Sequence, residues 1–252
     1  MILDILKNEL VGVKIPKPIG ELSGHNSGEP FAEFVLDKLK NKYNNKIQKQ
    51  YEYLNNLYSN NPNCSDEERL NLIKSKTSTY LLRRGKDVTK KWNKDNLFTY
   101  KQNDTADILY VDDNSFNIID VKTTNIEKGG QPPNIISATK VAEMCKLMIE
   151  NNEYNDIDIN YIGIYWSLED EKLVSKNIEV KNLFKSNPNN LYINWAAAMQ
   201  IQFHIHQLDQ NFSHNKKEWC KTYLKHFIDS VENRKNTMTK KFIKPYEKYL
   251  EE

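Results

Sequence analysis

The sequence predicts an α/β fold in which helices flank a central mixed β-sheet. Two pairs of apolar runs, each pair separated by a short polar turn, predict β-hairpins at residues 107–122 and 158–180. Apolar residues at helical spacing predict helices before, between and after these hairpins. This order of elements is typical of a sheet with helices packed on it.

The N-terminal part of the chain is expected to be mostly helical. A short helix fits residues 1–10, and a loop rich in Gly, Pro and Ser follows it. The next helix is expected to carry Pro30 in its first turn, because apolar residues recur at helical spacing from Phe31 to Leu39. The polar residues 46–100 are predicted to be largely helical.

Three more elements are expected after the first hairpin. A helix fits residues 135–151 and presents one apolar side. This side consists of Ala138, Val141, Ala142, Cys145 and Met148. The second hairpin is expected to turn at residues 169–171. Residues 216–249 are expected to form an amphipathic helix that is broken near Pro245.

Residues 191–206 fit two kinds of secondary structure. Their apolar residues alternate from Trp195 to Ile205, which favours a strand. A run of alanines favours a helix, as does the i, i+4 spacing of Trp195, Met199 and Phe203. Periodicity does not separate these alternatives.

The chain is expected to form one domain, residues 1–252, because no repeat or long linker divides it. Its parts are N-terminal helices and loop (1–45), a helical insertion (46–100), the first hairpin and its helix (101–151), and the remaining strands and C-terminal helices (152–252).

Composition favours a cytoplasmic protein. The net charge of +2 permits a nucleic-acid partner without requiring one. Cys64, Cys145 and Cys220 have no CxxC spacing, so neither a disulfide framework nor a zinc site is expected. Neither a signal peptide nor a membrane span is expected.

The first hairpin brings charged residues to one face of two otherwise apolar strands. With Asp112–Ser115 as the turn, Asp107 lies directly opposite Asp120. Opposed residues share one face of a sheet, with Cβ atoms about 5 Å apart. Lys122 lies two residues beyond Asp120 and therefore points to the same face.

This cluster suits a metal ion and a phosphate. Two carboxylates so close repel by about 3 kcal/mol in a medium of intermediate dielectric constant, unless one is protonated or a cation lies between them. Mg²⁺ commonly takes one or two carboxylates together with waters and phosphate oxygens. Lys122 would then contact a phosphate oxygen or an attacking water. The alternative is a plain Asp120–Lys122 ion pair, but the opposed Asp107 favours the metal site.

These residues resemble a known nuclease signature. Asp107, followed after twelve residues by Asp120-Val121-Lys122, resembles the PD-(D/E)xK motif, with Ala106 in place of the usual Pro. Longer strings, among them LSGHNSGEPF, DVKTTNI, PPNIISATK and LYINWAAAMQIQFH, are similar to the HincII family of type II restriction endonucleases. This resemblance extends over most of the chain.

The resemblance implies a restriction-endonuclease-like core, a homodimer, and Mg²⁺-dependent hydrolysis of both strands of double-stranded DNA in a bacterial cytoplasm. It implies the site GTYRAC (Y, pyrimidine; R, purine), cut bluntly to leave 5′-phosphates, and a cognate DNA methyltransferase. Asp107 and Asp120 would bind Mg²⁺. The Val121 carbonyl would complete the metal shell, and Lys122 would be the catalytic lysine. The alternatives are a PD-(D/E)xK nuclease of repair or recombination without site specificity, and a DNA-binding protein that is not an enzyme.

The resemblance also implies DNA-binding residues. Gly130 permits backbone angles that allow close approach to DNA. Gln131 would wedge into the base stack and help to bend the DNA, and without the resemblance it is as well explained as an exposed loop residue. Tyr192 and Asn194 would take part in base recognition, although Asn194 alone is more typical of a turn or cap. Asn134 would contact a phosphate or cap the helix that follows it.

Other polar residues carry weaker signals. His25, in the string SGHNSGEP, is a candidate phosphate contact. Glu29 is either an accessory acid or a first-turn helix residue. His204 and His206 are spaced to share one face of a strand, but a metal site there has no evident third ligand.

Overall fold

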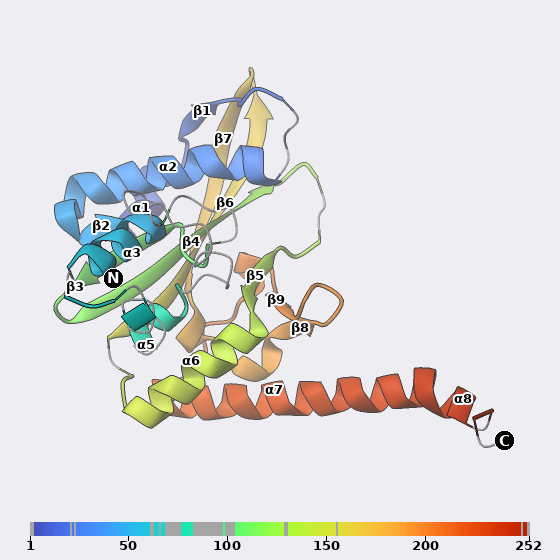
Figure 1. Cartoon of the computed structure of the whole chain (residues 1–252). Helices are drawn as coiled ribbons and strands as arrows, with labels where there is room; N and C mark the ends of the chain where they lie inside the picture. The colour runs from blue at the N-terminus through green and yellow to red at the C-terminus, as the bar shows by residue number, and fades with distance from the viewer. Residues whose placement is uncertain are drawn as a thin grey trace.

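A six-stranded mixed sheet forms the centre of the structure (Figure 1). The computed structural model describes residues 3–20, 22, 24–60, 63–65, 67–68, 77–82, 98, 104–128, 131–154, 156–247 and 249–250. The strand order is β1-β7-β6-β4-β3-β2, in which β4 and β6 are parallel and the other neighbours antiparallel. The strands are Lys14–Pro16 (β1), Ile47–Gln48 (β2), Ile108–Asp112 (β3), Ser115–Asn125 (β4), Ile157–Glu169 (β6) and Lys172–Asn182 (β7).

Helices cover both faces of this sheet, as predicted. They are Asp4–Leu10 (α1), Gly24–Tyr43 (α2), Ala138–Asn151 (α6) and Lys216–Met238 (α7). Helices α1 and α2 share one apolar core with Ile119 and Val121, whereas α6 and α7 share the other with Phe116 and Ile118. Successive side chains of β4 thus enter opposite cores. Burial on both sides explains the nearly continuous apolar runs of the sequence.

Helix α2 begins earlier than the sequence predicts. It starts at Gly24, so Pro30 lies inside the helix and not in its first turn. A proline there removes one backbone hydrogen bond. Burial of Phe31, Val35 and Leu39 in the α1–α2 core stabilises the helix on the other side of this defect. The prediction of a loop up to Pro30 was therefore wrong.

The helix predicted at residues 135–151 begins later, at Ala138, because a strand, β5 (Asn134–Ser137), precedes it. Two β-branched residues, Ile135 and Ile136, favour extended backbone at this point. Ser137, with extended φ and ψ, precedes the first helical residue. The predicted apolar side of α6 is confirmed, since all five of its residues are buried.

The second hairpin turns where the sequence predicts. Asp170 and Glu171 link β6 to β7 with φ of 47° and 57°. Positive φ at both central residues is the backbone of the type I′ turn, whose twist matches that of paired strands.

Residues 191–206 form neither one strand nor one helix. Two short strands, β8 (Tyr192–Asn194) and β9 (Gln200–Gln202), flank a turn in which Ala198 and Met199 have φ of 52° and 56°. Asn194 Oδ1 accepts the N–H groups at 196 and 197, at 2.9 and 3.2 Å, which turns the chain. Strands β5, β9 and β8, in that order, form a second antiparallel sheet, here called the small sheet.

The break predicted near Pro245 is not found, because the backbone stays helical and changes only its hydrogen bonding before the proline. Helix α7 is followed by a π-helical stretch, Thr239–Ile243, and by α8 (Lys244–Glu247). Together they project well beyond the body of the protein (Figure 1).

Only part of the predicted helical insertion at 46–100 is described. Helices α3 (Gln50–Ser59) and α5 (Thr77–Tyr80) lie in it, and most of the remainder falls outside the described residues. In the part of the chain that the structure describes, no helix is both long and apolar enough to span a membrane.

Alanine at Gly163 is expected to destabilise the protein. The added Cβ would lie 2.9 Å from the Ile205 Cβ, and overpacking of this kind costs about 1–3 kcal/mol. Gly28→Ala is the matched control, because its Cβ would contact Thr123 Oγ1 at 3.5 Å and alanine favours a helix by up to about 1 kcal/mol. Urea denaturation measures both, and equal unfolding free energies would contradict the prediction.

Candidate active site

The register of β3 against β4 places two carboxylates opposite each other, as the sequence predicts. Ile108 pairs with Ile119, and the same register places Asp107, directly before β3, opposite Asp120. The Val121 N–H donates to Asp107 Oδ2 at 2.8 Å. This bond holds the Asp107 carboxylate beside the strand that carries Asp120.

Asp120 is an acid enclosed in the protein core. The residue is only 4% exposed. Burial raises the pKa of its carboxyl to about 8, against the opposing effect of the Lys122 ammonium and with a further increase from Asp107. Lys122 Nζ donates to Asp120 Oδ1 at 2.8 Å. Without a metal, Asp120 therefore keeps a proton at neutral pH, and a divalent cation would displace it.

The two carboxylates fit a hard cation with an incomplete protein shell. Mg²⁺ prefers oxygen ligands and usually keeps several waters. Among the described residues, no three side chains of His, Cys, Asp or Glu converge, so a cation here would have positions for water and phosphate oxygens. The Val121 side chain enters the α1–α2 core, so only its backbone is available to the site.

Tyr161 on β6 belongs to this site and was not singled out from the sequence. It is the register neighbour of Asp120, and its buried hydroxyl has no hydrogen-bond partner among the described residues. Burial, followed by the Asp120 charge, raises the Tyr161 pKa well above its usual value. The phenol is therefore a neutral donor beside the carboxylates. An aromatic residue in an apolar run gives no such signal, because the pairing of β4 with β6 is long-range.

A chain of side-chain amides crosses the small sheet. Asn194 Nδ2 donates to Gln202 Oε1 at 2.9 Å, and Gln202 Nε2 donates to Asn134 Oδ1 at 2.7 Å. The register also aligns Asn134, Gln202 and Tyr192 across the three strands. The structure thus brings together three predicted residues and adds Gln202, which the alternating pattern of 200–205 could have indicated.

The structure bears on the capping role predicted for Asn134 and on the turn role predicted for Asn194. Asn134 lies in β5 and does not cap α6, so its predicted capping role was wrong. Asn194 uses Oδ1 for its turn and Nδ2 for the amide chain. Gln202 donates to Oδ1 of Asn134 and so orients the Asn134 amide. The Nδ2 group of Asn134 points away from this bond and can donate to another partner.

The other candidate DNA-binding residues do not take part in the bonds of the amide chain, or lie outside the described part of the structure. Tyr192 is 61% exposed, and Gln131 is exposed ahead of β5. Gly130 lies outside the described residues. His25 lies in α2, with its side chain outside the described part, so the predicted loop around it is helical. Glu29 lies beyond the first turn of α2, which excludes the first-turn role.

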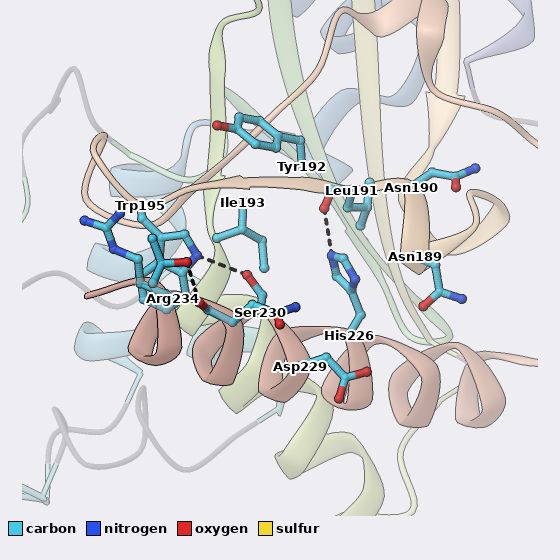
Figure 2. Close-up of a pocket in the computed structure, with 12 residues that line it drawn as sticks. Asn189, Asn190, Leu191, Tyr192, Ile193, Trp195, His226, Asp229, Ser230 and Arg234 are labelled. Carbon is cyan, nitrogen blue, oxygen red and sulfur yellow. Dashed lines mark hydrogen bonds between the residues drawn. The ribbon is translucent and has the colours of Figure 1, made fainter. Parts of the chain in front are cut away.

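Helix α7 supports the strand β8 at both ends (Figure 2). His226 Nε2 donates to the Leu191 carbonyl at 2.8 Å, and Trp195 Nε1 donates to Ser230 Oγ at 3.0 Å. A cavity of about 570 Å³ remains between strand and helix. The edge strand of the small sheet is thereby fixed to a long helix that is itself anchored in the core.

The chain is similar to known type II restriction enzymes. The family described as restriction endonuclease HincII matches residues 6–250 of the chain. The type II restriction enzyme HindII of Haemophilus influenzae is 50% identical over 243 residues, and the type II restriction enzyme HincII of Haemophilus influenzae is 49% identical over 243 residues. Each alignment covers 96% of this chain and 94% of the relative.

Asp120→Asn is expected to remove a pH dependence of stability in the metal-free protein. The folded state keeps the Asp120 proton up to a pKa of about 8, whereas an unfolded aspartate releases it near about pH 4. Raising the pH between these values therefore lowers the free energy of unfolding of the parent, because only the folded state still holds the proton.

Urea denaturation with a chelator, at a series of pH values across this window, measures the difference. The turn variant Asp113→Asn is the control and should keep the slope of the parent. Parallel stability curves for the parent and Asp120→Asn would contradict the assignment of the proton.

Proposed function

Because this chain belongs to the restriction endonuclease HincII family, we propose that it hydrolyses both strands of double-stranded DNA at a short palindromic site, with Mg²⁺ as cofactor. The observation that carries this proposal is the opposition of Asp107 and Asp120, with Lys122 bonded to Asp120 at 2.8 Å. Acids for a cation and an amine for a phosphate meet on one sheet face.

Different groups of the site would have different roles in phosphodiester hydrolysis. Asp107 and Asp120 would hold Mg²⁺, with the Val121 carbonyl as a further ligand. The ion, when bound, supplies stabilisation of negative charge on the phosphate under attack. Lys122 Nζ would hydrogen-bond a phosphate oxygen or orient the attacking water. Water adds to phosphorus and the bond to the 3′ oxygen breaks, which leaves a 3′-hydroxyl and a 5′-phosphate.

The finer proposal concerns the site and the assembly. We propose GTYRAC, cut bluntly at its centre, as the recognised sequence, on the ground of similarity to the HincII family. A palindrome has two-fold symmetry and each chain carries one set of Asp107, Asp120 and Lys122, so a homodimer would cut both strands. A cognate DNA methyltransferase would protect the same sites in the host.

The small sheet is the proposed base-reading surface. Tyr192 and Asn194 would contact base edges. Asn134 would contact an adjoining phosphate, and its bond from Gln202 supports this role because it fixes the direction of the Asn134 donor. Gln131 would act on the base stack, so that the energy of bending the DNA contributes to selectivity. Gly130 and His25 remain proposed contacts to the DNA backbone.

Plasmid digestion tests the reaction. The parent with Mg²⁺ should give discrete blunt fragments ending in 5′-phosphates, whereas a smear would favour the nuclease without site specificity. Asp107→Ala and Asp120→Ala should each lower the cutting rate by at least about a hundredfold, since each removes part of the stabilisation of the transition state. Both variants should still bind DNA. Cutting by Asp120→Ala at the parental rate would overturn the proposal.

Tyr192→Ala is expected to relax base discrimination. Loss of one base contact costs about 1–3 kcal/mol of discrimination, measured as the ratio of cutting rates on the proposed site and on sites with one changed base pair. Asn134→Ala should instead lower the rates on all sites by a similar factor, because a phosphate contact carries no sequence information. Gln202→Ala should lower them less, because Asn134 remains but loses its orientation. Gln131→Ala should alter selectivity mainly at the central base step. A uniform fall in all rates for Tyr192→Ala would argue against base contact.

A further inference from the structure

We propose that His204 and His206 form a binding site for a DNA backbone phosphate that neighbours the phosphate cleaved. This inference rests on the proposed function, because it requires DNA to reach both the Asp107–Asp120 site and the small sheet. The two histidines are not needed for the metal site or the amide chain.

The segment 203–206 lies against the strand beside the catalytic carboxylates. The Phe203 ring packs edge-on against Tyr161, with ring centroids 5.4 Å apart. Tyr161 is in turn the register neighbour of Asp120. The segment therefore starts one strand away from the buried acid.

The next contact of this segment lies beside Lys122. Gly163 is the register neighbour of Lys122, and Ile205 packs so closely on Gly163 that an added Cβ would approach the Ile205 Cβ to 2.9 Å. A glycine at this position lets the segment lie close to the sheet. His204 lies between these two contacts, and so its backbone lies over β6, the strand that neighbours Asp120 and Lys122.

The two imidazoles lie on the outer side of the segment. Ile201, Phe203 and Ile205 are buried, and alternation along the extended backbone sends the His204 side chain the other way. The His206 ring stacks on the His204 ring, with centroids 5.4 Å apart and 19° between the planes. His204 is half-buried and His206 exposed, so both rings can be reached from solvent.

Tyr165 orients the His206 ring. The Tyr165 hydroxyl oxygen accepts the His206 backbone N–H at 3.0 Å and lies 3.1 Å from Nδ1. With the hydroxyl hydrogen donated to Nδ1, the neutral ring carries its own proton on Nε2. The ring then presents an N–H donor on the side away from Tyr165.

The His204 ring is available for a ligand. The ring stacks on His206. It has no hydrogen-bond partner in the described portion of the chain. Glu179, whose charge acts on Tyr165, is ion-paired with Lys181 at 3.5 Å. The Lys181 ammonium thereby offsets the charge of this carboxylate, which favours acceptance of an anion.

The position of His204 and His206 indicates which anion they would bind. Gln202 bonds to Asn134 on the small sheet, and the next four residues lie beside the strands of the catalytic site. The segment thus connects the two regions that DNA is proposed to reach. The group that a DNA strand presents between the cleaved bond and the bases being read is the phosphodiester, which takes N–H donors from side chains.

Single methylphosphonate substitutions test the proposal, because each removes the charge of one phosphate. Binding of the parent to a duplex with the proposed site, in Ca²⁺, should weaken about tenfold when one particular phosphate near the cut is neutralised. The His204→Ala/His206→Ala variant should bind the unmodified duplex about tenfold more weakly and lose nothing further at that phosphate.

Matched measurements separate the outcomes. His214→Ala, which removes a histidine elsewhere on the surface, should behave as the parent. Thermal denaturation checks that the double variant is folded, and the His204→Gln/His206→Gln variant, which keeps N–H donors, should recover part of the affinity. Identical methylphosphonate penalties in the parent and the double variant would overturn the phosphate site while leaving the nuclease assignment intact. A parent that neither binds nor cuts the duplex would overturn both.

Discussion

Burial of the Asp120 carboxyl is the constraint on which the site depends. Strand β4 is covered by helices on both faces, so a charge on it loses its hydration, and this loss outweighs the attraction of the adjacent Lys122 ammonium. In the folded protein the Asp120 carboxyl is therefore neutral until a cation displaces its proton. The opposed Asp107 carboxylate, held by the Val121 N–H, is the second oxygen ligand that the proposed Mg²⁺ would require.

The proposed metal site and the proposed base-reading surface lie on different sheets, and packing sets the position of these sheets relative to each other. The chain leaves β9 at Gln202, contacts β6 through Phe203 and Ile205, and returns through α7, whose side chains hold both ends of β8. These supports are apolar contacts and buried hydrogen bonds, which hold geometry more firmly than exposed loops do. Phosphodiester chemistry requires such placement, because small displacements of a reacting group cost large factors in rate.

Local patterns predicted the parts of the molecule that depend on local interactions. A two-residue turn fixes the register of β3 and β4, so the opposition of Asp107 and Asp120 could be read from the sequence. The role of Tyr161 could not, since its neighbour Asp120 comes from a distant strand, and neither could the bond between Gln202 and Asn134, although the alternating pattern of 200–205 indicates Gln202 itself. The start of α2 was missed for a related reason, because tertiary burial overrides the local preference of a proline.

The two hairpins of the central sheet differ in how much change of length they can absorb. The β6–β7 pair already contains a register shift between Tyr165 and Trp166, so its ladder accommodates irregularity. The β3–β4 pair has an unbroken register up to its turn. One residue inserted there would carry Asp107 to the opposite face, into the apolar core of α1 and α2. The opposition of the two acids therefore depends on the spacing of twelve residues between them, whereas the β6–β7 connection is under no such requirement.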